Sequence, residues 1–273
     1  MTKLMTFLLL MSLAAGISLA DSYYGMITGD RALVFREDAA LFEEPGESSH
    51  IVCTLPVGEE LFQLAAVDIQ YEGDGMSCTW MEAFYAMDGD TCRGYIPHSW
   101  LALTDQTLSG DTLFLFGIDT YYPDRYRFVG SARAVSGGEI LWESVFYPPG
   151  GSFGGNDYRY GVASRQVDAE DYPFGNLVML SFIYEACGFE NRDVLFVWTG
   201  SYLVRGISAS TVSEAGVFHY TEEFIFPEQE APLSARIMLV TTSEEFDDDI
   251  MDYFITSQDT TNYFWNGLEF VTF

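Results

Sequence analysis

The sequence predicts an all-β protein in which a small N-terminal barrel precedes a mainly antiparallel β domain, either a sandwich or a partial propeller. Three observations favour this fold class. Short apolar runs alternate with turn residues about every 8–12 residues. Aromatic residues, which favour strands, make up 16% of the chain. The 3.6-residue period of amphipathic helices is nearly absent, although Ser208–Phe218 is predicted to contain one short helix capped by a serine.

The N-terminus has the pattern of an export signal. Lys3 precedes a mostly apolar run, Leu4–Ala15. The small residues Ser18 and Ala20 then follow at the spacing that a signal peptidase recognises. An uncleaved anchor is the alternative, but the run is shorter than the roughly 20 residues of a spanning helix. We expect residues 1–20 to be a signal peptide and the protein to be exported, periplasmic or extracellular, with no transmembrane segment after cleavage.

The composition excludes several kinds of chemistry. Lys3 is the only lysine, and without it the chain carries 11 arginines against 41 Asp and Glu. A P-loop, a kinase ATP site, a Schiff-base enzyme and a Ser–Lys hydrolase all require a lysine. So acidic a surface repels nucleic acid, and we expect no nucleic-acid partner. We favour solubility or adaptation to salt as the explanation of the acidity; the alternative is attraction to a cationic partner or to calcium.

No metal and no cofactor are predicted. The acidic clusters, of which Glu244–Asp249 is the longest, lack the twelve-residue spacing of a calcium-binding loop. The Asp-Gly-Asp segment at residues 88–90 is typical of a hairpin turn. The cysteines contain no C-x-x-C pair, which argues against a zinc site or a thioredoxin-like centre.

Disulfides are plausible in an exported chain. The four cysteines are Cys53, Cys78, Cys92 and Cys187. If the chain turns at residues 88–89, Cys92 lies opposite Tyr85 rather than Cys78. The local register therefore does not favour a Cys78–Cys92 disulfide, and the pairing stays open.

The first region is predicted to consist of strands joined by turns. Extended segments are expected at Arg31–Phe42, Ile51–Leu55, Glu59–Ile69, Thr79–Met87 and Arg93–Pro97. Residues 104–111, which contain Ser, Thr, Gly and Asp, are predicted to be a linker. The N-terminal domain then spans residues 21–103 and the C-terminal domain residues 112–273.

The second region contains two similar segments, residues 196–204 and 263–271. Each is an aromatic strand, a glycine-containing turn and a returning strand. The pair Asn266-Gly267 is typical of a type I′ turn. We interpret the segments as two similar hairpins, because two copies do not establish the period of a true repeat.

Several motifs of the first region occur in a recognisable order. They are a turn at residues 45–49, Ile51-Val52, the run TLPVGEEL at residues 54–61, Trp80, RGYI at residues 93–96, and Trp100-Leu101. With these motifs, residues 26–103 resemble a bacterial SH3 (SH3b) domain. The chain departs from that family in its long Asp68–Cys78 loop. It departs again at Val34-Phe35-Arg36, where the family more often has Asn-Val-Arg.

The resemblance implies a barrel that holds an exported protein on cell-wall peptide or on another envelope protein. Aromatic residues at the barrel mouth would suit such binding. The candidate ligand-binding residues are Tyr71, Trp80, Tyr95 and Trp100. For the mid-strand Trp80 and Tyr95 we favour a place in the core over ligand contact, whereas Tyr71 is expected to be exposed in its loop.

We predict a non-enzymatic binding module, with no catalytic residue assigned and the oligomeric state left open. The alternative is a cell-wall hydrolase with its active site in residues 112–273. A Cys–His enzyme there would have to use Cys187 and His219. Cys187 ends an apolar strand, where a buried structural thiol is expected. A third hypothesis is an assembly component with a cationic partner.

Overall fold

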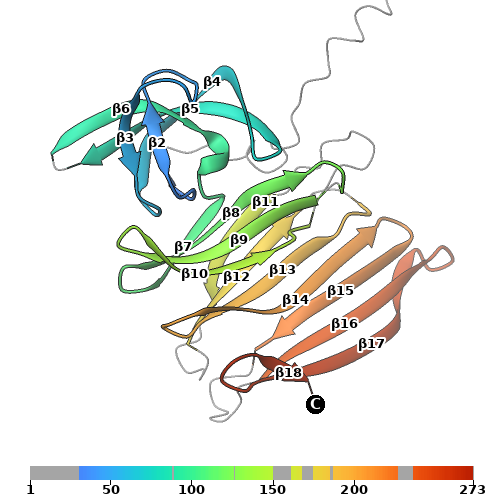
Figure 1. The fold of residues 1–273 in the computed structure, drawn as a ribbon. Coiled ribbons are helices and arrows are strands. Elements are labelled where there is room, and N and C mark those ends of the chain that lie inside the picture. The colour runs from blue at the N-terminus through green and yellow to red at the C-terminus, as the bar shows by residue number, and fades with distance from the viewer. Residues whose placement is uncertain are drawn as a thin grey trace, which may run out of the picture.

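The computed structural model describes residues 31–87, 89–125, 127–149, 161–167, 175–184, 187–226 and 236–272. The predicted signal peptide, residues 1–20, lies outside these ranges. Within them the chain forms three antiparallel sheets (Figure 1). The prediction of an all-β fold is confirmed. No helix in the described part of the chain is long and apolar enough to cross a membrane.

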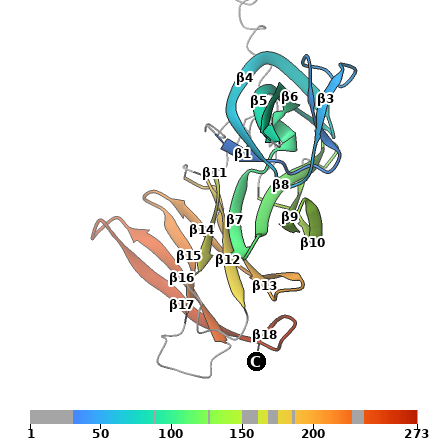
Figure 2. The same cartoon turned by 90° about the vertical axis from the view of Figure 1, so that its left-hand side faces the viewer.

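The first sheet has six strands in the order β1-β4-β5-β6-β2-β3. They are β1 (Arg31–Leu33), β2 (Ala39–Phe42), β3 (Ile51–Leu55), β4 (Glu60–Gly73), β5 (Met76–Met87) and β6 (Asp90–Pro97), followed by the 3₁₀ turn η1 (His98–Trp100). Figure 2 shows β4 curving around this part of the molecule. Among the described residues β1 and β3 do not pair, so an open, curved sheet stands where a small barrel was predicted.

A hairpin replaces the predicted loop at Asp68–Cys78. The strands β4 and β5 continue to a two-residue turn, Asp74-Gly75, in which both residues have positive φ, 54° and 72°. Asp and Gly tolerate this left-handed backbone, and a two-residue turn of this kind matches the twist of the flanking strands. Tyr71 consequently pairs with Cys78 inside the sheet.

The second sheet has four strands in the order β10-β9-β8-β7. They are β7 (Thr104–Ser109), β8 (Thr112–Tyr122), β9 (Arg127–Ser136) and β10 (Glu139–Phe146). The predicted linker at residues 104–111 is therefore wrong in its local structure: it is β7 and the turn into β8. Thr104 pairs with Phe116 and Thr107 with Leu113 of the long apolar strand β8. The polar composition of residues 104–111 does not indicate this pairing, because the partner strand lies outside the segment.

The third sheet has eight strands arranged in chain order. They are β11 (Gly161–Val167), β12 (Asn176–Ile183), β13 (Asn191–Trp198), β14 (Leu203–Glu214), β15 (Phe218–Ile225), β16 (Arg236–Asp247), β17 (Asp252–Trp265) and β18 (Phe270–Thr272). The helix predicted within Ser208–Phe218 is wrong. Thr211 pairs with Asn191 on one side and Thr221 on the other, and pairing on both sides outweighs the local helix signal.

The two similar segments form hairpins of this sheet, β13–β14 and β17–β18. They touch, since the Tyr202 hydroxyl donates a 3.2 Å hydrogen bond to the Gly267 carbonyl. The predicted type I′ turn at Asn266 is wrong, because Asn266 does not have the positive φ that this turn requires. Its side-chain oxygen instead accepts hydrogen bonds from the N–H groups of Leu268 (2.8 Å) and Glu269 (3.0 Å).

The apolar strand β8 is buried on both faces. Phe114 lies 5.4 Å from Phe196, and Phe116 lies 5.3 Å from Phe182, measured between ring centroids. These contacts join the second and third sheets face to face, which is the sandwich rather than the propeller alternative. Leu115, on the opposite face, packs in a separate buried cluster with residues of the first sheet. The three sheets therefore share β8 as a common wall.

The third sheet curls over its own face. Leu195 and Val197 of β13 are fully buried. Phe224, Trp265 and Phe270, from the later strands β15, β17 and β18, pack against their cluster. The later strands thus cover the face of the earlier strands that the second sheet leaves free.

Candidate binding site

Three of the four predicted ligand-binding residues lie in the core of the first sheet. Tyr71, Trp80 and Trp100 are only 5%, 2% and 4% exposed, and Tyr95 is half-buried. The Tyr71 ring meets Trp80 and Trp100 edge-to-face at 5.7 and 6.0 Å, and Phe42 meets the same two indoles at 5.6 and 6.0 Å. Such pairs stabilise a core beyond the area they bury.

The expected exposure of Tyr71 is wrong, because the hairpin turn lies at residues 74–75 and leaves Tyr71 within β4. Burial raises the pKa of its phenol. The interpretation of Trp80 as core is confirmed by its burial. Ligand binding by these aromatic residues stays a prediction, and the accessible surface lies elsewhere, at the junction between the first and second sheets.

Arg133 of β9 joins the two sheets at this junction. Its side chain is 9% exposed, and its guanidinium lies 4.0 Å from the centre of the Phe35 ring and donates to the Phe35 carbonyl. It also donates to Glu143 (2.7 Å) and to Asp119 (3.0 Å). Burial raises the pKa of Asp119 to about 6, and Arg133 and the Ser131 hydroxyl oppose that rise. A buried arginine with this many partners fixes the relative position of both sheets.

A second arginine and a close backbone approach reinforce the junction. Arg36 pairs with Asp74, and its guanidinium lies 4.6 Å from the centre of the Trp100 ring. The Thr120 hydroxyl donates to the Asp74 carbonyl (2.6 Å). Gly117 lies directly under the Phe35 ring, since a Cβ at this position would come within 2.5 Å of that ring. The sheets approach this closely because Gly117 has no side chain.

An inner cavity of about 260 Å³ lies between these groups. Its walls are Phe35, Arg36, Glu37, Asp74, Ser99, Ile118, Asp119 and Arg133. Both arginines are engaged by carboxylates of the same cavity. The positive charges of both arginines in the cavity are therefore matched by carboxylates. These ion pairs stabilise the junction and leave little unpaired positive charge for a ligand.

An outer groove of about 720 Å³ adjoins the cavity and shares Glu37 with it. Its lining is Glu37, Asp38, Ala39, Thr54, Leu55, Pro56, Val57, Gly138, Glu139 and Ile140. Among these described residues five are apolar, three are carboxylates and none is basic. Glu37, Asp38 and Glu139 are all exposed. The groove therefore combines an apolar floor with an acidic rim, and its volume is within the usual range of ligand sites.

The bottom of the groove is formed where two turns meet. Gly137 and Gly138 join β9 to β10 with positive φ of 58° and 82°. A Cβ at Gly138 would lie 2.8 Å from the Cβ of Pro56. The hairpin turn can lie against Pro56 only because Gly138 has no side chain.

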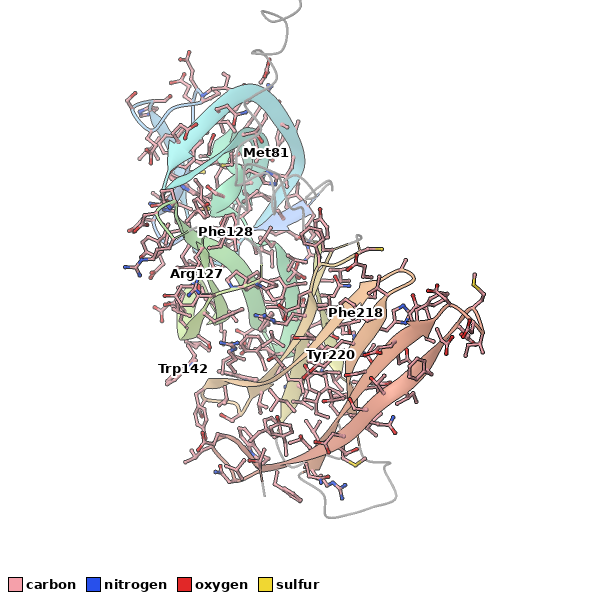
Figure 3. All side chains as sticks on the ribbon, turned by 90° about the vertical axis from the view of Figure 1, so that its right-hand side faces the viewer. Met81, Arg127, Phe128, Trp142, Phe218 and Tyr220 are labelled. Atoms are coloured by element: carbon pink, nitrogen blue, oxygen red, sulfur yellow. The ribbon has the colours of Figure 1, made fainter. Side chains whose placement is uncertain are left out.

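A second exposed surface lies on β10, an edge strand of the second sheet. Figure 3 shows Trp142 at the outer edge of this sheet, away from Met81. Trp142 is 46% exposed and its ring lies 6.0 Å from Tyr202; Leu141 and Val145 on the same strand are also exposed. Exposed apolar residues on an edge strand are typical of contact surfaces.

The Cys–His alternative stays a hypothesis. Cys187 is exposed, which differs from the buried thiol that was expected. His219 stacks on Tyr253 at 3.9 Å, and its Nδ1 lies 3.4 Å from Glu244. Neither contact aligns it with a cysteine. Among the described residues no cluster of three or more His, Cys, Asp or Glu side chains is arranged to hold a metal ion.

The junction residues were missed in the sequence because they are brought together from distant segments. One signal was present: Arg133 interrupts the small and apolar run from Gly130 to Val135, and a charged residue within a buried strand requires partners. Comparison with protein-family models, with curated proteins and with solved structures finds no match to this chain. The resemblance to an SH3b domain therefore stays a prediction.

Proposed function

We propose that this is an exported, non-enzymatic binding protein that takes an extended, cationic peptide segment, such as an amine-bearing cell-wall peptide, into the groove between its first and second sheets. The observation that supports this proposal is the lining of the groove, an apolar floor with Glu37, Asp38 and Glu139 at its rim. Carboxylates attract ammonium groups, and the apolar floor accommodates the aliphatic part of the same side chain.

The edge strand β3 supports an extended occupant. Thr54 and Leu55, at its end, line the groove. In the described part of the chain β3 pairs only with β2, so its other backbone edge is free to bind a peptide strand. The same groove would also accept a basic segment of an envelope protein, and the test below separates the two ligands.

Removing the rim charges is expected to reduce binding to purified cell-wall sacculi about tenfold, because each exposed ion pair contributes about 0.2–1 kcal/mol. The variant is Glu37→Gln/Asp38→Asn/Glu139→Gln. Asn is suited to position 38, whose φ is 57°. The measurement is the fraction of protein that co-sediments with sacculi at increasing concentration.

The matched control is Glu72→Gln/Asp111→Asn/Asp124→Asn, which removes the same charge from exposed positions outside the groove. Acetylation of the free amines of the sacculi is expected to abolish binding by the unmodified protein, and added salt to weaken it. Equal co-sedimentation of the groove variant and the control would contradict the proposal. Acetylation also neutralises the lysines of any protein left on the sacculi, so the two ligands are separated by digesting the sacculi with a protease beforehand: binding lost after that digestion would point to an envelope protein.

A further inference from the structure

We propose that Cys53 and Cys92 form a disulfide in the exported protein, and that this cross-link holds the wall of the groove that β3 provides. The cross-link follows from the arrangement of the cysteines alone, whereas its effect on binding rests on the proposed function. All four cysteines are thiols in the structure, and a disulfide can form only between two of them whose side chains meet.

The side chains of Cys53 and Cys92 point into the same interior. Side chains alternate between the two faces of a strand, so Cys53 shares a face of β3 with Leu55, and Cys92 shares a face of β6 with Gly94. Leu55 and Gly94 are buried, and both cysteines pack against the main hydrophobic cluster. The two thiols are in side-chain contact with each other. Two thiols that meet from the same interior satisfy one requirement of a disulfide, because side chains that point apart cannot be bridged without backbone movement.

The other two cysteines have different surroundings. Cys78 is fully buried, and its sulfur accepts a 3.3 Å hydrogen bond from the Ser99 amide. Cys187 is exposed and lies in the third sheet region, after β12. The β5–β6 hairpin places Cys92 opposite Tyr85, as predicted, and not opposite Cys78. The pairing that the sequence left open is therefore decided in favour of Cys53–Cys92.

The cross-link would strengthen the connection between the β2–β3 hairpin and β6, which has the least backbone pairing in the first sheet. Among the described residues β2 pairs with β6 only through Phe42 and Tyr95, whereas β5 and β6 pair along their whole length. The β2–β3 hairpin is thus held to the rest of the sheet by little backbone pairing. A bond from Cys53 to Cys92 ties β3 directly to β6, and Thr54 and Leu55 of the groove follow Cys53 on the same strand.

The oxidation balances with a small disulfide, such as oxidised glutathione, as the oxidant. One protein thiol loses its proton and attacks the glutathione disulfide, which gives a mixed disulfide and one glutathione thiol. The second protein thiol then attacks the protein sulfur of that mixed disulfide and releases the second glutathione thiol. Two protein thiols are oxidised and one glutathione disulfide is reduced. Burial and the neighbouring Cys92 raise the pKa of the Cys53 thiol to about 11, so this exchange is expected to be slow at neutral pH.

The test is peptide mapping of the full chain secreted into an oxidising compartment, with free thiols alkylated before unfolding and again after it. We expect one linked peptide pair that contains Cys53 and Cys92, lighter by two hydrogen atoms than the separate peptides, and alkylated Cys187. Reduction of this protein is expected to lower its melting temperature by about 5–10 °C. Cys53→Ser should abolish that response to reductant, and the matched control Cys187→Ser should retain it.

Alkylation of both Cys53 and Cys92 in the secreted protein would overturn the proposal, and so would a linked peptide with any other pairing. These readouts do not depend on a ligand. If Cys53→Ser fails to fold, comparison of the unmodified chain before and after reduction still tests the cross-link. Weaker binding to sacculi after the disulfide has been broken by a reductant would support the role of the cross-link in the groove. Loss of binding by the rim-charge variant under oxidising conditions tests the proposed function separately.

Discussion

Replacing Arg133 with alanine is expected to destabilise the protein by about 3–5 kcal/mol, which is the usual effect of removing one partner from a buried ion pair. The substitution leaves Asp119 without its cation and removes the guanidinium that lies on Phe35. The measurement is the free energy of unfolding from urea titration. Without Arg133 the pKa of Asp119, already raised by burial, rises further, so the destabilisation should be larger at pH 8 than at pH 5.

Two further variants test the physical reason for this effect. Adding Asp119→Asn to Arg133→Ala should recover part of the lost stability, since it removes the unpaired carboxylate. Arg125→Ala is the control, because Arg125 is exposed and pairs with Asp124 only at 3.8 Å; its effect should stay within about 0.5 kcal/mol. A loss below about 1 kcal/mol for Arg133→Ala would contradict the structural role assigned to this residue.

His98 is expected to make the protein sensitive to acid. It is 5% exposed in η1, and burial lowers its pKa to about 4, from 6.5 for an exposed histidine. Because the unfolded chain takes up this proton at a higher pH than the folded chain does, the stabilisation from neutral His98 is complete above pH 6.5. It is lost as the pH falls toward 4, and it amounts to about 3 kcal/mol over that window.

The measurement is the free energy of unfolding at several pH values between 4 and 8 for the unmodified protein and for His98→Gln. Whatever the stability of the variant at neutral pH, the difference between the two proteins should shrink by about 3 kcal/mol toward pH 4. His50→Gln, at an exposed position, should follow the unmodified protein throughout. A constant difference between His98→Gln and the unmodified protein would refute the assignment.

The fold class was predictable because it depends on local patterns. The turn at residues 88–90 correctly predicted that Tyr85 faces Cys92. Other local patterns failed where a distant strand decided the outcome. The polar residues of Thr104–Ser109 form a strand because β8 pairs with them, and Thr211 lies in a strand because it has a neighbour on both sides.

The candidate site was much less predictable. The resemblance to a known domain predicted four aromatic binding residues, and three of these four are buried. The groove depends on Pro56 meeting Gly138, two residues that lie in connections of different sheets. A single sequence records that each lies in a turn, but not that the two turns touch. Arg133 and Asp119 lie on the two paired strands β8 and β9, and only the folded structure shows that their side chains meet, at 3.0 Å.

The strand β8 has a thermodynamic consequence for the whole molecule. Leu115 is fully buried against the first sheet, and Phe114 and Phe116 on the other face are fully buried against the third. Neither side can detach without exposing part of the other's interior. The two regions should consequently melt in one cooperative transition, with equal calorimetric and van't Hoff enthalpies, as a single folding unit does.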